Sequence, residues 1–355
     1  MEISLCMIAK NEEDVIARCI SSIKDIVDEI IIVDTGSTDN TIEIAKNLGA
    51  SVYEFEWIDD FSKARNYSFS KATKDYILWL DADDILNPDD IDKFRELKSN
   101  VNNLVDSVTM NYVLTVGPKG EFISSLRRNR LVKRERNFKW IGQVHEYLEV
   151  YGNIINSDIN VIHKKEKAYT NRNLRIYEES IAQGKELSTR DKYYYANELC
   201  DNGRYDEAIE QYIKFINTNE GWVEDIKGAC SKIADCYSYK KDSENELRYL
   251  FKSFEYDVPR ADFCCRLGHK FFGENKLDIA IYWYNQAINA APKEGNLSLI
   301  NHDTYTFTPW VQLCVCHDRK GDMKLAIECN EMAAKYKPDS PAVKHNREYF
   351  KTKIQ

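Results

Sequence analysis

The stretch EIIIVDTGSTDNTIEIAKNLGASVYEFEW (residues 29–57) predicts the fold of the N-terminal half. It starts with a run of Ile and Val, which favours a buried strand, and it ends with a second strand-like segment, SVYEFEW. Between them, Ser and Thr precede a segment with the apolar spacing of a helix, which stops at Gly49. Two strands and a helix joined by short turns indicate an α/β fold with a mainly parallel sheet.

The same alternation continues on both sides of this stretch. Residues 3–10 and 76–80 are predicted strands, and residues 12–26 and 62–72 are predicted helices. In sheets of this kind, ligands bind beyond the carboxyl ends of the strands, so we expect a binding site there. Polar residues follow the predicted strand ends at residues 10–12, 34–37, 59–60 and 81–83.

The segment YILWLDADDIL (residues 76–86) ends a buried strand in three carboxylates, Asp81, Asp83 and Asp84. Like charges packed this closely repel each other, and burying them without a partner is costly. A divalent cation would offset that cost, because hard cations prefer oxygen ligands. The alternative is a helix N-terminus, since Asp stabilises a first turn and Pro88 is typical of its first position. The other polar strand ends favour the metal site.

Composition and charge exclude several classes of protein. The chain has 355 residues, of which 43% are apolar and 30% charged, as expected for a globular protein of two domains. Its net charge of −9 argues against general nucleic-acid binding. No stretch reaches the ~18 apolar residues of a transmembrane helix, and no secretory signal is visible. Ten cysteines lack metal-type spacing, and CC (264–265) and CVC (314–316) fall inside helical patterns. We expect reduced thiols and a cytoplasmic protein.

The second half of the chain contains a helical repeat. Residues 266–292, RLGHKFFGENKLDIAIYWYNQAINAAP, place Gly268, Ala280 and Tyr284 at offsets of the 34-residue tetratricopeptide pattern. We expect an all-α tetratricopeptide-type solenoid of about four repeats, because such units bury their apolar faces by stacking. One possible role of the repeats is to make the protein rigid or to join two copies into a homodimer. The other is to hold a peptide or another partner. Related copies lie at residues 192–215, 230–259 and 309–338, with an insertion at residues 293–304.

Four motifs, SLCMIAKNEE, IIIVDTGSTDNT, FSKARNYSFSKA and ILWLDADD, occur in this order near the N-terminus. In order and spacing they resemble the nucleotide-sugar half of family-2 glycosyltransferases with the GT-A fold, a Rossmann-like mixed α/β sheet. WIGQVHEYL, VIH and RNLRIYEE resemble a bacterial branch with tetratricopeptide repeats behind the transferase domain, the plan of sublancin-type peptide S-glycosyltransferases. The resemblance covers residues 1–185. It implies a transferase domain (1–170), a linking helix (171–187) and repeats (188–355).

The resemblance implies a metal-assisted reaction, in which bound Mn²⁺ or Mg²⁺ neutralises the charge of the departing diphosphate. Asp83 resembles the family's metal ligand, and His163 resembles a third ligand at the end of INVIH. Asp81 would contact the ribose, or the metal through water. Asp84 is free in this scheme to cap the following helix. A purely structural role is the alternative for His163.

The same resemblance assigns residues to the nucleoside of the donor. Asp34 resembles the family's nucleoside-binding acid, because a carboxylate suits ribose hydroxyls or a base N–H. Asn11, Glu12 and Arg65 are further candidates for a uridine pocket. Each of these three is alternatively a residue of a helix face or a helix cap.

Inverting transfer needs a general base on the side opposite the leaving group. In WIGQVHEYL, the pair His145-Glu146 occupies the position of the family's acidic base, and we assign Glu146 as the base. His145 is the second candidate, because histidine titrates near neutral pH. Trp140 and Gly142 would form the preceding loop, where glycine permits close approach of the backbone to the sugar. A core aromatic is the alternative for Trp140.

The run RRNRLVKRERNFK (residues 127–139) has seven Lys or Arg and one Glu in an otherwise acidic chain. One interpretation is a solvated hairpin. The others are contact with the diphosphate or attraction of an acidic acceptor.

Together these features predict an inverting glycosyltransferase that moves a hexose from a UDP-sugar to a Cys, Ser or Thr side chain of a peptide or protein. The hexose is glucose or N-acetylglucosamine, and a bacteriocin precursor is one such acceptor. An alternative acceptor is a cell-surface glycan or its lipid-linked precursor. A hypothesis of another class is a non-catalytic scaffold that senses a nucleotide-sugar, which the full set of carboxylates argues against. The sequence leaves open the sugar, the acceptor, the S- or O-linkage and the oligomeric state.

Overall fold

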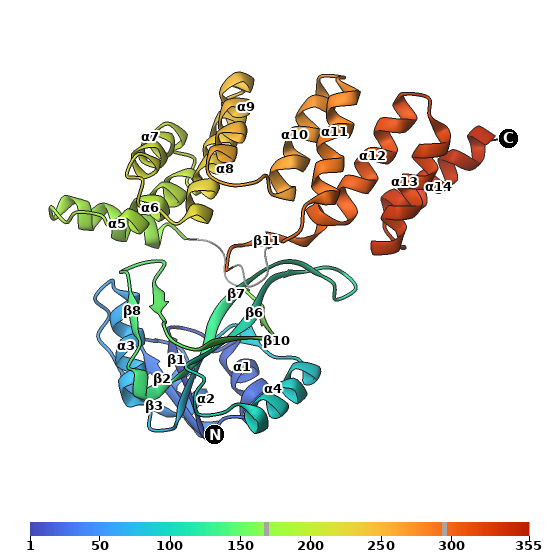
Figure 1. Ribbon diagram of the computed structural model, residues 1–355. Coiled ribbons are helices and arrows are strands. Elements are labelled where there is room, and N and C mark those ends of the chain that lie inside the picture. Colours follow the sequence, from blue (N-terminus) through green and yellow to red (C-terminus); the bar gives the residue numbers. More distant parts are fainter. Residues whose placement is uncertain (167–169, 293–296, 355) are drawn as a thin grey trace. The chain divides into compact units, whose positions relative to one another are not determined.

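Strands and helices alternate along the first part of the chain, as the sequence predicts (Figure 1). The structure, a computed structural model, describes residues 1–166, 170–292 and 297–354. α1 begins later than predicted, because Glu12 O accepts turn hydrogen bonds from the amides of Val15 and Ile16. The first elements are β1 (Ile3–Ala9), α1 (Ile16–Ile23), β2 (Glu29–Asp34), α2 (Thr41–Asn47), β3 (Ser51–Glu54), α3 (Phe61–Lys71) and β4 (Tyr76–Trp79).

The later strands extend the sheet into a mixed one. Along the sheet the order is β3-β2-β1-β4-β7-β6-β10-β5. The first four strands are parallel, β7 is antiparallel to both β4 and β6, and β10 is parallel to β6. The predicted mixed α/β sheet is therefore confirmed. The remaining elements are β5 (Asp84–Ile85), α4 (Pro88–Asn100), β6 (Ser107–Val116), β7 (Phe122–Lys133), the 3₁₀ helix η1 (Arg134–Arg136), β8 (Lys139–Ile141), β9 (Tyr147–Glu149) and β10 (Ile154–His163).

Side chains alternate along β1 and so build a core on each face of the sheet. Leu5 and Met7 pack in one core together with Ile16 of α1. Cys6 points to the opposite face and joins a second core that contains Trp79 and side chains of α3. α1 and α4 accordingly lie on one side of the sheet and α3 on the other (Figure 1). Each buried Leu or Ile contributes about 1.5–3 kcal/mol, which fixes the sheet and the strand ends that carry the candidate site.

The chain divides into two compact units, which are described separately. The predicted linking helix corresponds to α5 (Arg172–Ala182), which belongs to the first unit. The division falls inside α6 (Thr189–Asp201), so the first helix of the predicted repeats contributes residues to both units. The units are Met1–Tyr194 with Leu297–Leu299, and Tyr195–Asn296 with Ile300–Gln355.

The second unit consists of antiparallel helices of the tetratricopeptide type. Ala280 and Tyr284 are fully buried, and a Cβ at Gly268 would lie 2.7 Å from the Tyr284 ring. Glycine at position 268 therefore lets two helices pack closely, and the predicted all-α repeat region is confirmed. Of the predicted insertion, residues 293–296 lie outside the described residues. The elements are α7 (Tyr205–Ile216), α8 (Val223–Tyr239), α9 (Ser243–Lys252), η2 (Ser253–Glu255), α10 (Ala261–Gly273), α11 (Leu277–Asn289), β11 (Ile300–Asn301), η3 (His302–Tyr305), α12 (Phe307–Arg319), α13 (Met323–Tyr336) and α14 (Pro341–Ile354).

All ten cysteines are buried and free, as the sequence predicts. Cys264 and Cys265 lie in α10, and burial raises the pKa of each thiol to about 12. These thiols are therefore protonated and inert packing residues. Among the described residues, no helix combines the length and the apolar character that crossing a membrane requires.

Candidate active site

The candidate site lies at the carboxyl end of β4, the strand between β1 and β7. Asp81, Asp83 and Asp84 follow this strand directly. The antiparallel pairing of β10 with β5 places His163 opposite Asp84. Sheet pairing thus brings a histidine from far along the chain to the acidic segment.

Asp83, Asp84 and His163 form a group that can hold a metal ion. Nδ1 of His163 lies 3.4 Å from Oδ1 of Asp83 and 3.4 Å from Oδ1 of Asp84. The ligand atoms of the three residues lie within 4.8 Å of one another. Two carboxylates and an imidazole fit a divalent ion. Asp83 and His163 lie together as the family resemblance implies, but Asp84 rather than Asp81 is the third member.

Asp84 does not cap the following helix, and that prediction is wrong. α4 begins at Pro88, whereas Asp84 lies in β5 and is fully buried. Its Oδ2 accepts a hydrogen bond from the Asp81 amide (2.9 Å) and lies 3.1 Å from Nη2 of Arg130. Burial raises the pKa of Asp84, and the charge of Arg130 opposes this effect. Arg130 therefore holds one oxygen of Asp84 while the other faces His163.

Two residues support this group: Arg130, known from the sequence only as part of the basic run, and Tyr112, which the sequence did not single out. Arg130 comes from β7 and is fully buried, and its guanidinium lies over the rings of Trp79 (3.8 Å) and Tyr112 (4.3 Å). The Tyr112 hydroxyl, from β6, lies 2.8 Å from Nδ1 of His163. These contacts orient the candidate ligands Asp84 and His163, as outer partners of metal ligands generally do.

The acidic neighbours control the charge of His163. Burial by itself lowers the pKa of this imidazole. The hydrogen bonds and charges of Asp83 and Asp84 outweigh burial and raise the pKa of His163 to about 10. A divalent ion held by the same atoms competes with this proton, because a metal binds the neutral imidazole.

Arg65 of α3 joins the acidic segment to the predicted base. Its Nε lies 2.5 Å from Oε1 of Glu146, and its Nη2 lies 2.7 Å from Oδ1 of Asp81. Burial raises the pKa of Asp81, but Arg65 and Arg130 outweigh burial and lower it to about 2. Asp81 is therefore engaged by an arginine, and Arg65 acts as a bridge between two candidate site residues rather than standing alone.

Trp140 is a buried aromatic that supports Arg65. The indole is 4% exposed and packs edge-to-face on Trp79 at 4.7 Å between ring centroids. The Arg65 guanidinium lies 4.8 Å from the Trp140 ring and 5.2 Å from the Trp79 ring. The backbone of Trp140 exchanges two hydrogen bonds with the Asn66 side chain. Trp140 is thus packed among other aromatic side chains, as expected for a core residue.

Residues 142–146, which we call the base loop, carry Gly142, His145 and Glu146. Gly142 has φ +102°, and a Cβ there would lie 3.4 Å from Cα of Glu146. A side chain at this position would therefore crowd the backbone of Glu146, and the predicted approach of the Gly142 backbone to the sugar stays a prediction. The His145 ring stacks on the ring of Tyr194, with 4.4 Å between centroids and 18° between planes.

Asp34 and its neighbours form a second polar group, at the ends of β1 and β2. Asp34 is 3% exposed, and its Oδ2 accepts hydrogen bonds from the amides of Gly36 (2.9 Å) and Ser37 (3.0 Å). Its Oδ1 is buried and accepts no hydrogen bond from the described residues. A buried carboxylate oxygen in this state fits a donor from a ligand, such as a ribose hydroxyl or a base N–H.

Asn11 and Glu12 tie the turn after β1 to the turn after β2. Oδ1 of Asn11 accepts from the Thr38 amide at 2.7 Å, and the Asn11 amide donates to Ser37 Oγ at 2.9 Å. The Glu12 amide donates to Thr41 Oγ1 at 2.7 Å. The observed contacts of Asn11 and Glu12 therefore shape the loops around Asp34.

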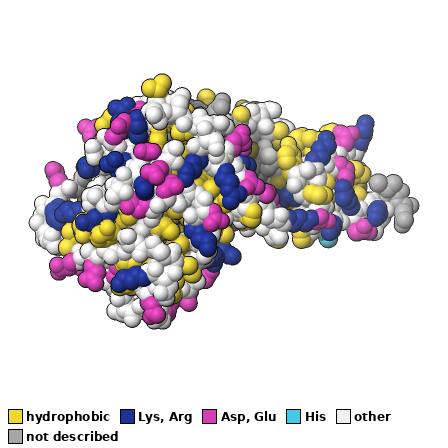
Figure 2. Space-filling view, turned by 90° about the horizontal axis from the view of Figure 1, so that it is seen from below, with side chains coloured by type: hydrophobic (Ala, Val, Ile, Leu, Met, Phe, Trp, Pro, Cys, Tyr) yellow, Lys and Arg dark blue, Asp and Glu magenta, His cyan; other side chains and the backbone are white. Residues whose placement is uncertain are grey.

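The basic run does not form one surface. Arg130 is buried at the site, Arg127 donates to the carbonyl of Ser157 (2.8 Å), and Arg136 pairs with Asp106. On the face shown in Figure 2, basic and acidic side chains are interspersed. These three arginines of the run therefore differ in burial and in their partners.

Arg128 differs from the other members of the run. Burial lowers its pKa, and the neighbouring charges of Arg130 and Arg190 lower it further. Among the described residues it pairs with no carboxylate, and the other residues that affect its pKa are Tyr112 and Tyr194. Of these two tyrosines, Tyr112 contacts His163 and Tyr194 contacts the base loop.

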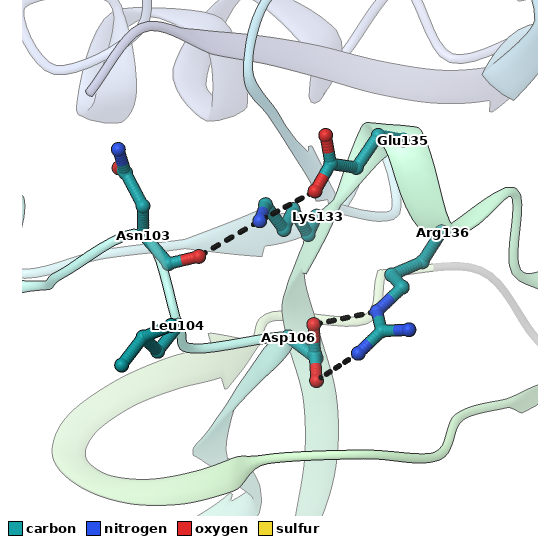
Figure 3. Close-up of a pocket in the computed structure, with 6 residues that line it drawn as sticks. All are labelled: Asn103, Leu104, Asp106, Lys133, Glu135 and Arg136. Atoms are coloured by element: carbon teal, nitrogen blue, oxygen red, sulfur yellow. Dashed lines mark hydrogen bonds and ion pairs between the residues drawn. The ribbon is translucent and has the colours of Figure 1, made fainter.

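A hollow at the opposite ends of the strands contains charged side chains that pair with one another (Figure 3). β4 starts at Tyr76, which pairs with Lys133, so this edge is the amino end of β4. Arg136 binds Asp106 through Nε (2.6 Å) and Nη2 (2.7 Å), and Lys133 lies 2.5 Å from Oε1 of Glu135. The charges drawn in Figure 3 are paired with one another, so this hollow lacks the excess of acids found near Asp81.

Comparison with protein-family models gives two matches. Residues 4–151 match the model described as "Glycosyl transferase family 2". Residues 100–262 match "SusR N-terminal TPR domain". The second match begins within the sheet unit, whereas the helices of the repeat type begin at α6. The description of the second match as a TPR domain therefore applies to its helical part, from α6 onward.

Similar curated proteins include a glycosyltransferase and a TPR repeat-containing protein. The SPbeta prophage-derived glycosyltransferase SunS of Bacillus subtilis is 30% identical over 230 residues, which are 59% of this chain and 52% of SunS. A TPR repeat-containing protein of Synechococcus elongatus is 46% identical over 101 residues, 28% of this chain and 24% of the relative. This chain thus spans about half or less of the length of these relatives. Among solved structures, TarS of S. aureus in complex with UDP is 14% identical and covers 72% of this chain and 91% of its own, with a TM-score of 0.40.

Proposed function

We propose that this chain, which carries a family-2 glycosyltransferase domain followed by tetratricopeptide-type helices, is a metal-assisted, inverting glycosyltransferase. The observation that carries the proposal is the arrangement at the carboxyl end of β4. There, one acidic group with His163 lies beside a second group in which Arg65 links Asp81 to Glu146. The first group suits an ion that binds a diphosphate, and the second suits a base that activates an acceptor.

The donor that we propose is a UDP-sugar, with glucose or N-acetylglucosamine as the hexose. Asp34, at the end of β2, supports a nucleoside pocket, because its buried Oδ1 can accept a hydrogen bond from a ligand hydroxyl or N–H. Asn11 and Glu12 shape the surrounding loops through backbone hydrogen bonds. A carboxylate in such a frame selects hydroxyl or N–H donors by direction.

Asp83, Asp84 and His163 would hold Mn²⁺ or Mg²⁺, with Asp81 nearby as a ribose or water contact. Such an ion supplies positive charge to the diphosphate as the sugar leaves. Arg130 keeps Asp84 oriented for this role, and Tyr112 does so for His163. Arg128 would add a further positive charge for the phosphates, since no carboxylate among the described residues neutralises it.

Glu146 would act as the general base. It removes the proton of the acceptor hydroxyl or thiol while the acceptor attacks the anomeric carbon from the side opposite UDP. The ion pair with Arg65 fixes the direction of the carboxylate, and Trp140 and Trp79 fix Arg65 in turn. His145 is the second candidate, because it is adjacent to Glu146 in the base loop.

The acceptor that we propose is a Cys, Ser or Thr side chain of a peptide or protein in the cytoplasm. The similarity to SunS and the presence of tetratricopeptide-type helices, which suit a peptide or a second copy of the chain, support this choice. A cell-surface glycan or its lipid-linked precursor is the alternative acceptor. The free, buried cysteines agree with a reducing compartment.

Release of UDP tests the proposal. The full chain is incubated with UDP-glucose or UDP-N-acetylglucosamine, with and without Mn²⁺, and with candidate peptides analysed by intact mass. We expect metal-stimulated release of UDP and a mass increase of one hexose unit on a peptide. A nucleotide-sugar-sensing scaffold binds UDP-sugar without releasing UDP under any of these conditions, and that result would refute the enzymatic role.

A further inference from the structure

His145 has a backbone conformation that residues other than glycine rarely adopt. Its φ is +51°, in the left-handed region. A histidine stays in this region only when its surroundings impose it, and such residues gather at functional sites. His145 directly precedes Glu146, so its backbone dihedrals set the direction in which the Glu146 side chain leaves the base loop.

Two residues of α6 contact His145. Tyr194 stacks its ring on the imidazole, with 4.4 Å between the centroids and 18° between the planes. Arg190 lies under the same tyrosine ring at 4.6 Å, and its Nη2 donates to the Tyr194 hydroxyl at 3.1 Å. The same Nη2 lies 3.4 Å from the carbonyl oxygen of His145. Side chain and backbone of His145 are thus both contacted from one helix.

The rest of the base loop is held from α5 and from the turn before α3. The Tyr177 hydroxyl of α5 donates to the Val144 carbonyl at 3.3 Å, and Ser180 Oγ donates to Gln143 Oε1 at 2.9 Å. From the other side, Gln143 Nε2 donates to the Asp59 carbonyl at 2.8 Å. His145 and Glu146, in contrast, are contacted from α6 and by Arg65.

We propose that Tyr194 and Arg190 are positioning residues for the transfer reaction, which hold His145 in its left-handed conformation and thereby direct Glu146 toward Arg65 and the acceptor. The inference rests on the proposed function of Glu146. If His145 relaxed to an extended conformation, the Glu146 carboxylate would leave its place 2.5 Å from Arg65 Nε. A displaced Glu146 could not accept the proton of the acceptor even when the donor is bound, because proton transfer requires the two groups to lie within hydrogen-bond distance.

The helix α6 follows the transferase motifs in sequence, yet in this proposal its side chains affect the transfer reaction. The predicted transferase domain ends at residue 170, and a chain cut after residue 186 keeps every sequence motif tied to the donor. It lacks Tyr194 and Arg190, however. Because the first unit extends to Tyr194, such a cut removes residues of this unit that contact His145.

The test uses the full chain with Tyr194→Leu and, as a matched control, Tyr194→Phe, which keeps the stacking ring. We expect Tyr194→Leu to lower kcat for transfer by roughly tenfold or more, with UDP affinity and KM for the donor within about twofold of wild type. Tyr194→Phe should keep kcat within about threefold of wild type. Arg190→Met is the second variant, and it should also lower kcat more than it changes donor KM.

A double-mutant cycle separates positioning from a general loss of structure. In a Glu146→Gln background, Tyr194→Leu should cause almost no further loss of kcat, because there is no base left to position. Independent losses that multiply would overturn the inference. So would wild-type kcat in both Tyr194→Leu and Arg190→Met, or equal losses of UDP affinity and kcat.

Hydrogen exchange of the base-loop amides gives a readout that needs no activity. Tyr194→Leu should speed exchange in residues 143–147, and Tyr194→Phe should not. Unchanged exchange in Tyr194→Leu refutes the positioning role by itself. Absence of UDP release by the wild type, with this exchange difference present, would instead refute the proposed function and leave the structural link standing.

Discussion

The amino and carboxyl ends of the strands in the first unit, which we call the amino edge and the carboxyl edge, use their charged side chains differently. At the amino end of β4, Asp106 pairs with Arg136 and Lys133 with Glu135. At the carboxyl end, the carboxylates share cations: Arg65 serves both Asp81 and Glu146. Asp83 and Asp84 share His163, and Arg130 pairs with the second oxygen of Asp84. Paired charges stabilise, whereas an excess of carboxylates beside a buried arginine costs stability and indicates a ligand.

This difference in charge pairing, rather than the size of a hollow, supports our proposal that the carboxyl edge is the functional one. The hollow in Figure 3 belongs to the amino edge, where each drawn charge has its partner. The carboxyl edge instead holds a buried carboxylate oxygen of Asp34 without a hydrogen-bond donor among the described residues. Variants at the two edges should therefore separate into losses of activity and losses of stability.

The largest effect is expected from Asp83→Ala. Removing one candidate ligand should lower metal-stimulated turnover by on the order of 10²- to 10³-fold, while the fold survives because Asp83 lies at the surface of the site. Turnover is measured over a range of Mn²⁺ concentrations, together with thermal unfolding. Asp92→Ala, on exposed positions of α4, is the control and should be silent. Full metal-stimulated turnover in Asp83→Ala would remove this residue from the site.

Glu146→Gln comes next. Glutamine keeps the size of the side chain but accepts no proton, so transfer should fall by roughly a hundredfold or more. UDP affinity, measured by calorimetry, should stay close to the wild-type value. Glu149→Gln, at an exposed position of β9, serves as the control. If the acceptor is a thiol, the loss should shrink at high pH, where thiolate already forms. A parallel loss of binding and turnover would make Glu146 a donor-site residue.

A smaller effect should come from Arg128→Met. The loss of one positive charge near the phosphates should weaken UDP binding by about tenfold and leave uridine binding unchanged. Arg127→Met is a matched control, because this neighbour donates to the Ser157 carbonyl on the other face of the strand. Wild-type UDP affinity in Arg128→Met, with a raised KM for an acidic acceptor, would assign Arg128 to the acceptor instead.

The smallest effect on activity is expected at the amino edge. Asp106→Asn should leave UDP release unchanged and lower the melting temperature. Arg136 and the Asn153 amide lower the pKa of Asp106 to about 2, so the carboxylate stabilises the fold above its ordinary pKa, and this contribution is lost as the pH falls through about 2. The difference in melting temperature from wild type should therefore be largest near neutral pH and vanish toward pH 2. Reduced UDP release in this variant would contradict the separation of the edges.

The sequence predicted the parts of the site that depend on local pattern. Runs of Ile and Val gave the parallel strands, and the position of Asp34, Asp81 and Asp83 after strand ends placed them at one edge. The buried cysteines and the close contact of Gly268 with Tyr284 followed from helical spacing. These features need only the period of a strand or a helix.

Features that depend on strand register could not be predicted. Arg130 and Tyr112 reach the site from β7 and β6. The pairing of these two strands contains register shifts, which cannot be predicted from the sequence pattern. The pairing of Asp84 with His163 joins residues far apart in the chain, so the sequence allows a helix-cap role for Asp84 that the structure excludes. For the same reason the bridge from Asp81 through Arg65 to Glu146 was invisible, although each of its members had been singled out.

Calorimetric titration of UDP into the full chain, with and without Mn²⁺, tests the central claim that the carboxyl edge is a metal-assisted nucleotide-sugar site. We predict that Mn²⁺ strengthens UDP binding by tenfold or more in the wild type and in Asp106→Asn, and that this gain disappears in Asp83→Ala. Equal UDP affinity with and without Mn²⁺ in the wild type would contradict the account.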